Sequence, residues 1–303
     1  MILLYHLLFP DDAPRDTWNA GKVVRASEFK LQVTWLKRHF NLVPLEKYID
    51  ELESNLLFAK RNISLTFDDG YHNTFELVSD FLIENNIPAT FFVSTSHLED
   101  GRLFWFAYFN ALCFEKVYKE LKIGTKTFPL VSEKTCYTAW HQLTKLARES
   151  GDTISFSRDF AEKYPLPENI KKRYLGLDKE QILTIGTSET LSLGGHTHHH
   201  PYLDTLSYEN QLDEILKNKH ILEDISTRSV PYFAYTGGIY NSASLMAVKN
   251  AGYKAAFTIS SLQLGTNYLY EIPRIDIYSP SIIKLNLKVH GISEITRRIG
   301  LKR

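Results

Sequence analysis

The chain has 303 residues, and 35 Lys and Arg balance 35 Asp and Glu, so its formal net charge is zero. Hydrophobic residues make up 44% and charged residues 23%, an ordinary globular composition that excludes disordered, collagen-like and coiled-coil chains. A neutral chain also argues against binding to nucleic acid through net charge, so we expect no nucleic-acid partner. The unusual count is histidine, because four of the 11 lie within positions 196–200.

Short β-like runs alternate with helical patterns along most of the chain. The expected strands are Ile2–Leu8, Asn62–Phe67, Ala89–Ser94, Leu191–Gly194, Pro231–Tyr235, Lys254–Ile259 and Ile272–Ile277. The expected helices begin at Ser27 and Pro44, cover Asn73–Asn86 and Ala243–Asn250, run from Ser207 to about Asp224, and begin again at about Ser281. This alternation predicts parallel strands packed against helices. We expect a closed or nearly closed (β/α) barrel, with a doubly wound open sheet as the alternative.

Residues 97–180 break this rhythm. They are aromatic and charged, with helical patterns at Leu103–Leu121 and Ser132–Glu149 and a turn at Lys122–Thr127. We expect a largely helical insertion within a single catalytic domain that spans 1–303. The insertion could cover a substrate cleft, and packing on the outside of the barrel is an equal alternative.

The cysteines and the N-terminal residues bear on the cellular location. Cys113 and Cys136 are too few for a disulfide framework and are not spaced as a metal pair, so we expect two buried, reduced thiols. The first apolar run is interrupted by His6 and has no basic region before it, which favours a buried strand over a signal peptide. No apolar run approaches the roughly 18 residues of a transmembrane helix. The expected location is cytoplasmic.

The first candidate for chemistry is Thr66–Gly70, which reads TFDDG at the end of an expected strand. Gly70 allows a turn that could direct Asp68 and Asp69 into the same site. The carboxyl ends of barrel strands carry the catalytic groups in barrel enzymes. The alternative is an ordinary Asp-Asp-Gly turn.

The second candidate is the histidine-rich stretch Gly194–Pro201. Its glycines and proline argue against a regular helix, and position 197 is not Glu, so the helical zinc-protease pattern does not apply. A loop could still bring His196 and His200 to one divalent ion. The alternative is a solvated or locally packed histidine turn.

Together the two stretches supply one carboxylate and two imidazoles for an ion, with a second carboxylate to spare. Three protein ligands leave coordination positions for water or substrate. A bound ion lowers the pKa of water, and the spare Asp can take its proton, which is the chemistry of metal-assisted hydrolysis. The same ligand set suits non-haem iron oxygenases, whose chemistry does not need the second Asp.

These motifs resemble those of the metal-dependent polysaccharide deacetylases, the NodB-homology or carbohydrate esterase family 4 type. Thr66–Gly70 matches TFDDG, and His196–Leu203 matches H-[ST]-x-x-H-P-x-L. The resemblance covers most of 1–96 and 185–277. It implies a distorted (β/α) barrel and a hydrolase that removes N-acetyl groups from an amino-sugar glycan or its cytoplasmic precursor during cell-surface polysaccharide biosynthesis.

The resemblance also implies residue roles. Asp69, His196 and His200 would bind the metal, Asp68 would be the general base, and Thr197 would support the metal loop by hydrogen bonding. The metal would be zinc, with cobalt, nickel, iron or manganese as alternatives.

The sequence departs from the family pattern at two places. The family's third motif usually carries an Arg where this chain has Ala234, so we expect Arg274 to orient Asp68 instead. The family's Leu-x-His motif, which usually lies late in the chain, has no clear match in this sequence. One circularly permuted subgroup carries the corresponding histidine in a Tyr-His pair near the N-terminus, and residues 5–6 resemble that pair. His6 would then be the general acid, with His290 as its competitor.

Other interpretations remain open at this point. One is hydrolysis of another amide, such as an N-formyl sugar or a cyclic amide, and another is a non-catalytic carbohydrate-binding descendant. The segment 281–303 carries six Lys or Arg against one acid and could rest on an anionic membrane. A helix that packs on the barrel with a solvated basic face is the alternative.

Overall fold

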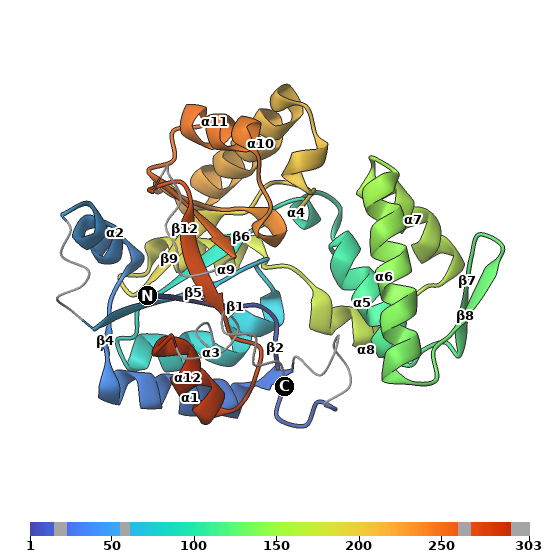
Figure 1. Ribbon diagram of the computed structural model, residues 1–303, viewed down its shortest axis with the longest axis horizontal. Coiled ribbons are helices and arrows are strands. Elements are labelled where there is room, and N and C mark those ends of the chain that lie inside the picture. Colours follow the sequence, from blue (N-terminus) through green and yellow to red (C-terminus); the bar gives the residue numbers. More distant parts are fainter. Residues whose placement is uncertain (15–22, 55–60, 260–267, 292–303) are drawn as a thin grey trace.

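The computed structural model describes residues 1–14, 23–54, 61–259 and 268–291. In this part of the chain, the main sheet has eight parallel strands in the order β1-β12-β11-β10-β9-β6-β5-β4. β1 also pairs with β5, so all of these strands except β4 close into a ring. The closed (β/α) barrel expected from the sequence is therefore confirmed, and an open sheet is excluded (Figure 1).

The barrel strands are short and mostly buried on both faces, which is why they read as apolar runs. They are β1 (Ile2–Tyr5), β5 (Asn62–Phe67), β6 (Ala89–Val93), β9 (Leu191–Gly195), β10 (Tyr232–Ala234), β11 (Ala255–Ile259) and β12 (Ile272–Asp276). β4 (Asn41–Leu42) pairs with the start of β5, and β2 (Leu8–Phe9) pairs with β3 (Val24–Arg25) outside the main sheet.

Helices surround the ring. They are α1 (Ala26–His39), α3 (His72–Glu84), α9 (Lys179–Thr187), α10 (Tyr208–Ser226), α11 (Ser242–Asn250) and α12 (Ile282–Val289), with short 3-10 helices η4 (Leu203–Thr205) and η5 (Thr236–Gly238). The main core lies between strands and helices, where Phe29 of α1 packs edge-on against Tyr5 at 5.0 Å. α2 (Leu45–Glu53) instead lies at the end of the barrel away from the insertion (Figure 1).

Successive residues of a strand point to opposite faces, so each strand also presents side chains to the inside of the ring. Phe91 belongs to the helix-facing core, whereas Phe92 belongs to a separate cluster with α2 residues. The guanidinium of Arg274, on β12, lies 5.1 Å from the ring centre of Phe92, on β6. Because β6 and β12 are not neighbours in the ring, these two side chains meet across the barrel interior.

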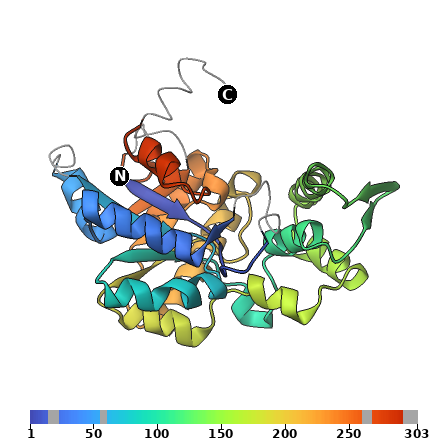
Figure 2. The same cartoon turned by 90° about the horizontal axis from the view of Figure 1, so that it is seen from below.

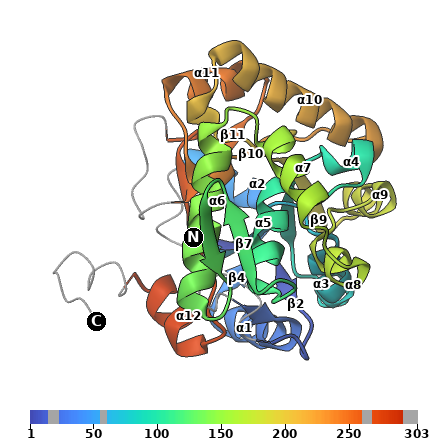
Figure 3. The same cartoon turned by 90° about the vertical axis from the view of Figure 1, so that its right-hand side faces the viewer.

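The expected insertion is a compact helical unit beside the barrel (Figures 2 and 3). It contains α4 (His97–Asp100), α5 (Trp105–Phe114), β7 (Glu120–Ile123), β8 (Lys126–Pro129), α6 (Glu133–Glu149), α7 (Thr153–Lys163), α8 (Glu168–Lys171) and η3 (Lys172–Tyr174). Its core also includes barrel-side residues such as Phe9 and Tyr71. Cys113 and Cys136 are buried thiols in this core and form no disulfide among the described residues, as expected.

Three expected element boundaries were wrong. The strand expected over Ile2–Leu8 is broken, because β1 ends at Tyr5 and β2 begins at Leu8. α1 begins at Ala26, with the Glu28 carboxylate accepting a hydrogen bond from the Arg25 N–H, so Ser27 does not cap it. The helix expected over Leu103–Leu121 ends at Phe114, because residues 120–123 alternate between exposed and buried and pair in a hairpin.

Within the residues that the structure describes, no helix is both long and apolar enough to cross a membrane.

Candidate active site

A buried ion pair lies inside the barrel at the carboxyl end of β5. Arg274 donates to both carboxylate oxygens of Asp68, with both contacts at 2.6 Å, and the two side chains are 0% and 1% exposed. Arg274 also donates to Thr66 Oγ1 at 3.3 Å. Two parallel N–H···O bonds fix the position and orientation of the carboxylate. The structure thus brings together Asp68 and the arginine that the sequence suggested for it.

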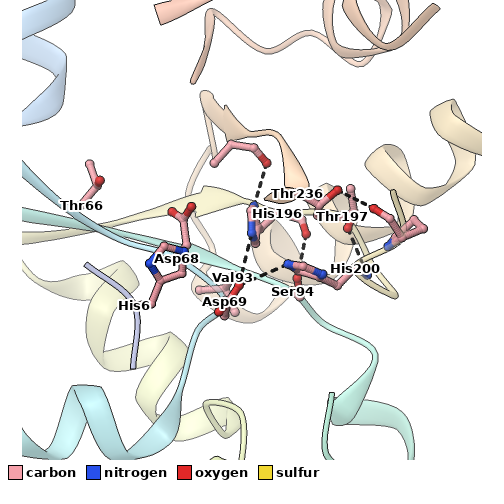
Figure 4. A network of polar contacts seen from close by, with 12 residues as sticks. His6, Thr66, Asp68, Asp69, Val93, Ser94, His196, Thr197, His200 and Thr236 are labelled. Carbon is pink, nitrogen blue, oxygen red and sulfur yellow. Dashed lines mark hydrogen bonds and ion pairs between the residues drawn. The ribbon is translucent and has the colours of Figure 1, made fainter. Parts of the chain in front are cut away.

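Asp69 lies beside this pair and faces two imidazoles (Figure 4). Its Oδ1 is 3.5 Å from His196 Nε2 and 3.2 Å from His200 Nε2. The Nδ1–H of His196 donates to the carbonyl oxygen of Ala234 at 2.7 Å, so its Nε2 carries the free lone pair in the neutral ring. One atom from each of the three side chains lies within 4.8 Å of the others. This donor set of two nitrogens and one oxygen fits a divalent ion such as zinc.

The backbone at this cluster is in an uncommon conformation. Asp69, Thr197 and His200 all have left-handed φ values, of 72°, 63° and 57°. Such values are unfavourable for a β-branched residue and persist where surrounding contacts enforce them. Thr197 Oγ1 accepts a hydrogen bond from the backbone N–H of His200 at 3.1 Å, which is the loop support expected of Thr197. The loop therefore turns sharply enough to return His200 to the side of His196.

The charges in the cluster influence one another. Burial would raise the pKa of Asp69, but hydrogen bonds from His196 and His200 outweigh it and hold that pKa well below its usual range. Burial lowers the pKa of His200 despite the nearby Asp69 carboxylate. For His196, burial is outweighed by the charge of Asp68 and the hydrogen bond to Asp69, which raise its pKa. An ionised carboxylate favours binding of a cation, and a cation at this cluster would displace the proton that the raised pKa of His196 favours.

His6 directly follows β1 and lies in the same region as Asp68 and Asp69 (Figure 4). Its Nδ1 is 3.7 Å from Oδ1 of Asp276, and the two side chains are 34% and 29% exposed, so a substrate could reach them. The competitor His290 is elsewhere. It is exposed at the end of α12, with Nδ1 donating to the Asn286 carbonyl at 3.0 Å.

Asp276 was not predicted from the sequence. It lies two residues after Arg274 on the same strand, and residues two apart share one face of a strand. Since Arg274 was expected to orient Asp68, that spacing is the signal in the sequence for a second charge on the same face of the strand.

Asn218 of α10 was also missed. Its Oδ1 accepts from the backbone N–H of His196 at 3.0 Å, and its Nδ2 donates to the Val93 carbonyl at 2.8 Å. It is fully buried, and it links the end of β6 to the start of the histidine loop. No local pattern in the sequence marks this contact, because α10 reads as an ordinary amphipathic helix.

The insertion contacts the histidine loop through Trp105 and Phe106. The indole N–H of Trp105 donates to the His200 carbonyl at 3.0 Å, and the Phe106 ring centre is 4.1 Å from that of His200. Trp105 is 1% exposed. The structure therefore joins the insertion directly to the histidine loop, and a role as a cover over a substrate cleft stays a prediction.

The family model for polysaccharide deacetylases matches residues 58–256. The chain belongs to the polysaccharide deacetylase family. The matched residues include Asp68, Asp69, His196 and His200. His6 and Arg274 lie outside it, on either side.

Among curated relatives, the poly-β-1,6-N-acetyl-D-glucosamine N-deacetylase of Staphylococcus aureus (strain MSSA476) is 27% identical over 150 residues. Those residues are 49% of this chain and 50% of that protein. The chain thus spans about half the length of the curated relatives that it matches.

Solved structures share the fold over nearly the whole chain. The deacetylase PplD of Streptococcus pyogenes, solved in complex with acetate, has a TM-score of 0.62 at 19% identity, covering 95% of this chain and 96% of that one. IcaB from Ammonifex degensii has a TM-score of 0.59 at 16% identity, covering 95% of each chain. The NodB-type barrel implied by the two motifs is confirmed.

The ion pair inside the barrel gives a stability prediction. Arg274→Met leaves the Asp68 carboxylate buried without its cation, and we expect a loss of about 3–5 kcal/mol in the free energy of unfolding. Adding Asp68→Asn to that variant removes the uncompensated charge and should recover part of the loss. Denaturant unfolding measures the free energy of unfolding of both variants.

Arg102→Met is the control, because Arg102 is 52% exposed in its ion pair with Asp100 and should change stability by about 1 kcal/mol or less. Equal losses for Arg274→Met and Arg102→Met would contradict the prediction.

Proposed function

We propose that this protein is a metal-dependent hydrolase that removes N-acetyl groups from amino sugars of a glycan or its precursor. The proposal rests on two groups of side chains that lie side by side in this member of the polysaccharide deacetylase family. Asp68, held by Arg274, lies next to a cluster of Asp69, His196 and His200 that suits a divalent ion.

Asp69, His196 and His200 would hold the ion, which we propose to be zinc because two imidazoles and one carboxylate are typical zinc ligands. When bound, such an ion supplies an acidified water and polarises the acetamide carbonyl. The Ala234 carbonyl fixes the ring of His196 through Nδ1, so its Nε2 stays directed at Asp69. Trp105 and Thr197 hold the backbone of His200 in place.

Asp68 is the proposed general base. Its carboxylate accepts the proton of the attacking water while oxygen adds to the acetamide carbon. Arg274 keeps this carboxylate in one orientation, because both of its oxygens are engaged by the guanidinium. Burial of the pair excludes bulk water from the face that Arg274 covers.

His6 is the proposed general acid. It donates a proton to the sugar nitrogen as the C–N bond breaks, so that acetate and a free amine leave. Asp276 lies on its Nδ1 side, 3.7 Å away, and would orient the ring. Both residues are partly exposed, which suits a group that must exchange protons between turnovers.

The substrate class rests on the family and on the curated relative, which is named for poly-β-1,6-N-acetyl-D-glucosamine. We propose an N-acetylated glycan or a precursor of cell-surface polysaccharide. The cytoplasmic location and the contact of 281–303 with an anionic membrane stay predictions. In the described part of that segment, α12 exposes Ile283 and Leu287, which are 74% and 39% exposed.

Acetate release tests the proposal. After chelation the protein should release no acetate from N-acetylglucosamine oligomers, and added zinc should restore release, also under anaerobic conditions. The panel should include β-1,6-linked and β-1,4-linked oligomers, nucleotide-linked and lipid-linked N-acetyl sugars, and an N-formyl sugar. Formate release alone would assign a different amide hydrolase. A metal-replete protein that is inactive on every substrate would support a carbohydrate-binding descendant instead.

The role of Asp68 has its own test. Asp68→Asn keeps the shape of the side chain but removes its basicity, so kcat should fall by about 10²–10⁴-fold while zinc content stays at the wild-type value. Zinc by elemental analysis and circular dichroism control for metal and fold. Asp80→Asn, an exposed change on α3, should keep full activity. Hydrolysis by Asp68→Asn at the wild-type rate would show that the base is another group.

The choice between His6 and His290 can be decided by paired variants. His6→Asn should lower kcat by about 10²–10⁴-fold with zinc binding unchanged, because it removes the proton donor and leaves the metal cluster intact. His290→Asn should behave as wild type, since His290 is exposed on α12. Steady-state kinetics with oligomers measures both variants. A large loss in His290→Asn with an active His6→Asn would reverse the assignment.

A further inference from the structure

Two histidines of the loop, His198 and His199, face away from Asp69. They face Glu99 of α4 and Glu214 of α10. The loop therefore presents imidazoles on two sides, and the proposed hydrolysis uses one side. The second side has its own set of potential ligands.

His198 is fully buried, yet one of its ring nitrogens lacks a hydrogen bond. Its Nδ1 lies 2.9 Å from Thr95 Oγ1, which can accept the ring proton. Its Nε2 has no hydrogen-bond partner among the described residues and lies 3.3 Å from Glu99 Oε1. A buried imidazole nitrogen without a hydrogen-bond partner is costly, and in the tautomer that donates from Nδ1 to Thr95 the lone pair of Nε2 faces a carboxylate. A cation between the two atoms would satisfy both.

His199 is oriented in the way that metal-bound histidines are. Its Nδ1–H donates to Glu214 Oε1 at 2.6 Å, and its backbone N–H donates to Glu214 Oε2 at 2.8 Å. With Nδ1 protonated and held by a carboxylate, Nε2 of the neutral ring is left as a lone-pair donor. Carboxylate–histidine–metal arrangements of this kind fix the ring and raise its basicity.

The three side chains converge. One potential ligand atom from each of Glu99, His198 and His199 lies within 4.8 Å of the others. Glu99 and His199 also line a cavity of about 630 Å³ between α4 and the insertion helices α7 and α8, so an ion has access from solvent. A competing cation is present, because Lys217 Nζ lies 2.8 Å from Glu99 Oε1.

We propose that Glu99, His198 and His199 bind a second divalent cation, with zinc favoured by the two imidazole ligands. The ion ties α4, which directly precedes the bulk of the insertion, to the histidine loop. Three protein ligands leave room for water from the cavity. The site does not rest on the proposed hydrolysis, since none of its ligands belongs to the Asp68 and Asp69 cluster.

Lys217 competes with a cation for Glu99. In the metal-free protein its ammonium group neutralises Glu99, so an arriving ion must displace it or share the carboxylate. Lys217→Met removes this competitor and should tighten binding at the second site by about tenfold or more. If Glu99 serves only an ion pair with Lys217, the same variant creates no metal affinity.

Metal stoichiometry tests the site. The chelator-stripped full chain is titrated with zinc and followed by native mass spectrometry and calorimetry, and wild type should bind two ions. Glu99→Gln and His199→Gln should each lose the second ion, or weaken it by about tenfold or more, while acetate release keeps the wild-type rate. The double variant Asp69→Ala/His200→Ala should keep one ion. His220→Gln, an exposed histidine of α10, is the control and should bind two.

The opposite results overturn the proposal. Saturation of wild type by one ion up to millimolar zinc would overturn it, and so would persistence of the second ion in both Glu99→Gln and His199→Gln. Unchanged zinc binding in Lys217→Met would also count against it. These outcomes leave acetate release untouched, so failure of the second site is distinguishable from failure of the proposed hydrolysis.

Discussion

The ion pair between Asp68 and Arg274 is the constraint around which the site is built. Placing a carboxylate inside a barrel costs several kcal/mol unless a well-aligned cation offsets it, and here both carboxylate oxygens meet the guanidinium. Arg274 reaches Asp68 because β12 is next to β1, and β1 is next to β5. Closure of the ring is thus what pairs the proposed base with its buried cation. An open sheet of the same strands would leave Asp68 without its partner.

Much of the site could be predicted because its motifs are local. Asp68 and Asp69 follow one strand directly, and the histidine loop follows another, so the convergence of strand ends in a barrel brings them together. Arg274 could be predicted because the family's usual arginine is replaced by Ala234, so another arginine had to orient Asp68. Its neighbour on the same face, Asp276, escaped notice because a lone acid in a strand has many ordinary explanations.

The rest could not be predicted because it depends on distant contacts. Trp105 holds His200 from 95 positions away, and Asn218 holds His196 from 22 positions away. Nothing in the helical pattern around either residue marks such a partner. The wrong start of α1 has a local cause, since Glu28 reaches back to the Arg25 N–H and replaces the expected serine cap. In the hairpin at residues 120–129, β7 has the strand period of two, which a four-residue run displays too briefly to recognise, and β8 is mostly exposed without that alternation.

The pairing of β1 with β12, which sets Leu3 beside Ile275, has a consequence for the order in which the protein matures. A ribosome delivers the histidine loop long before β12, so the ligand cluster can assemble while the barrel is still a gapped sheet. Arg274 and Asp276 arrive with the final strand, and contacts between such distant positions form slowly. The proposed acid His6 and base Asp68 are therefore synthesised long before the residues that position them. The site is complete only when β12 pairs with β1 and closes the ring.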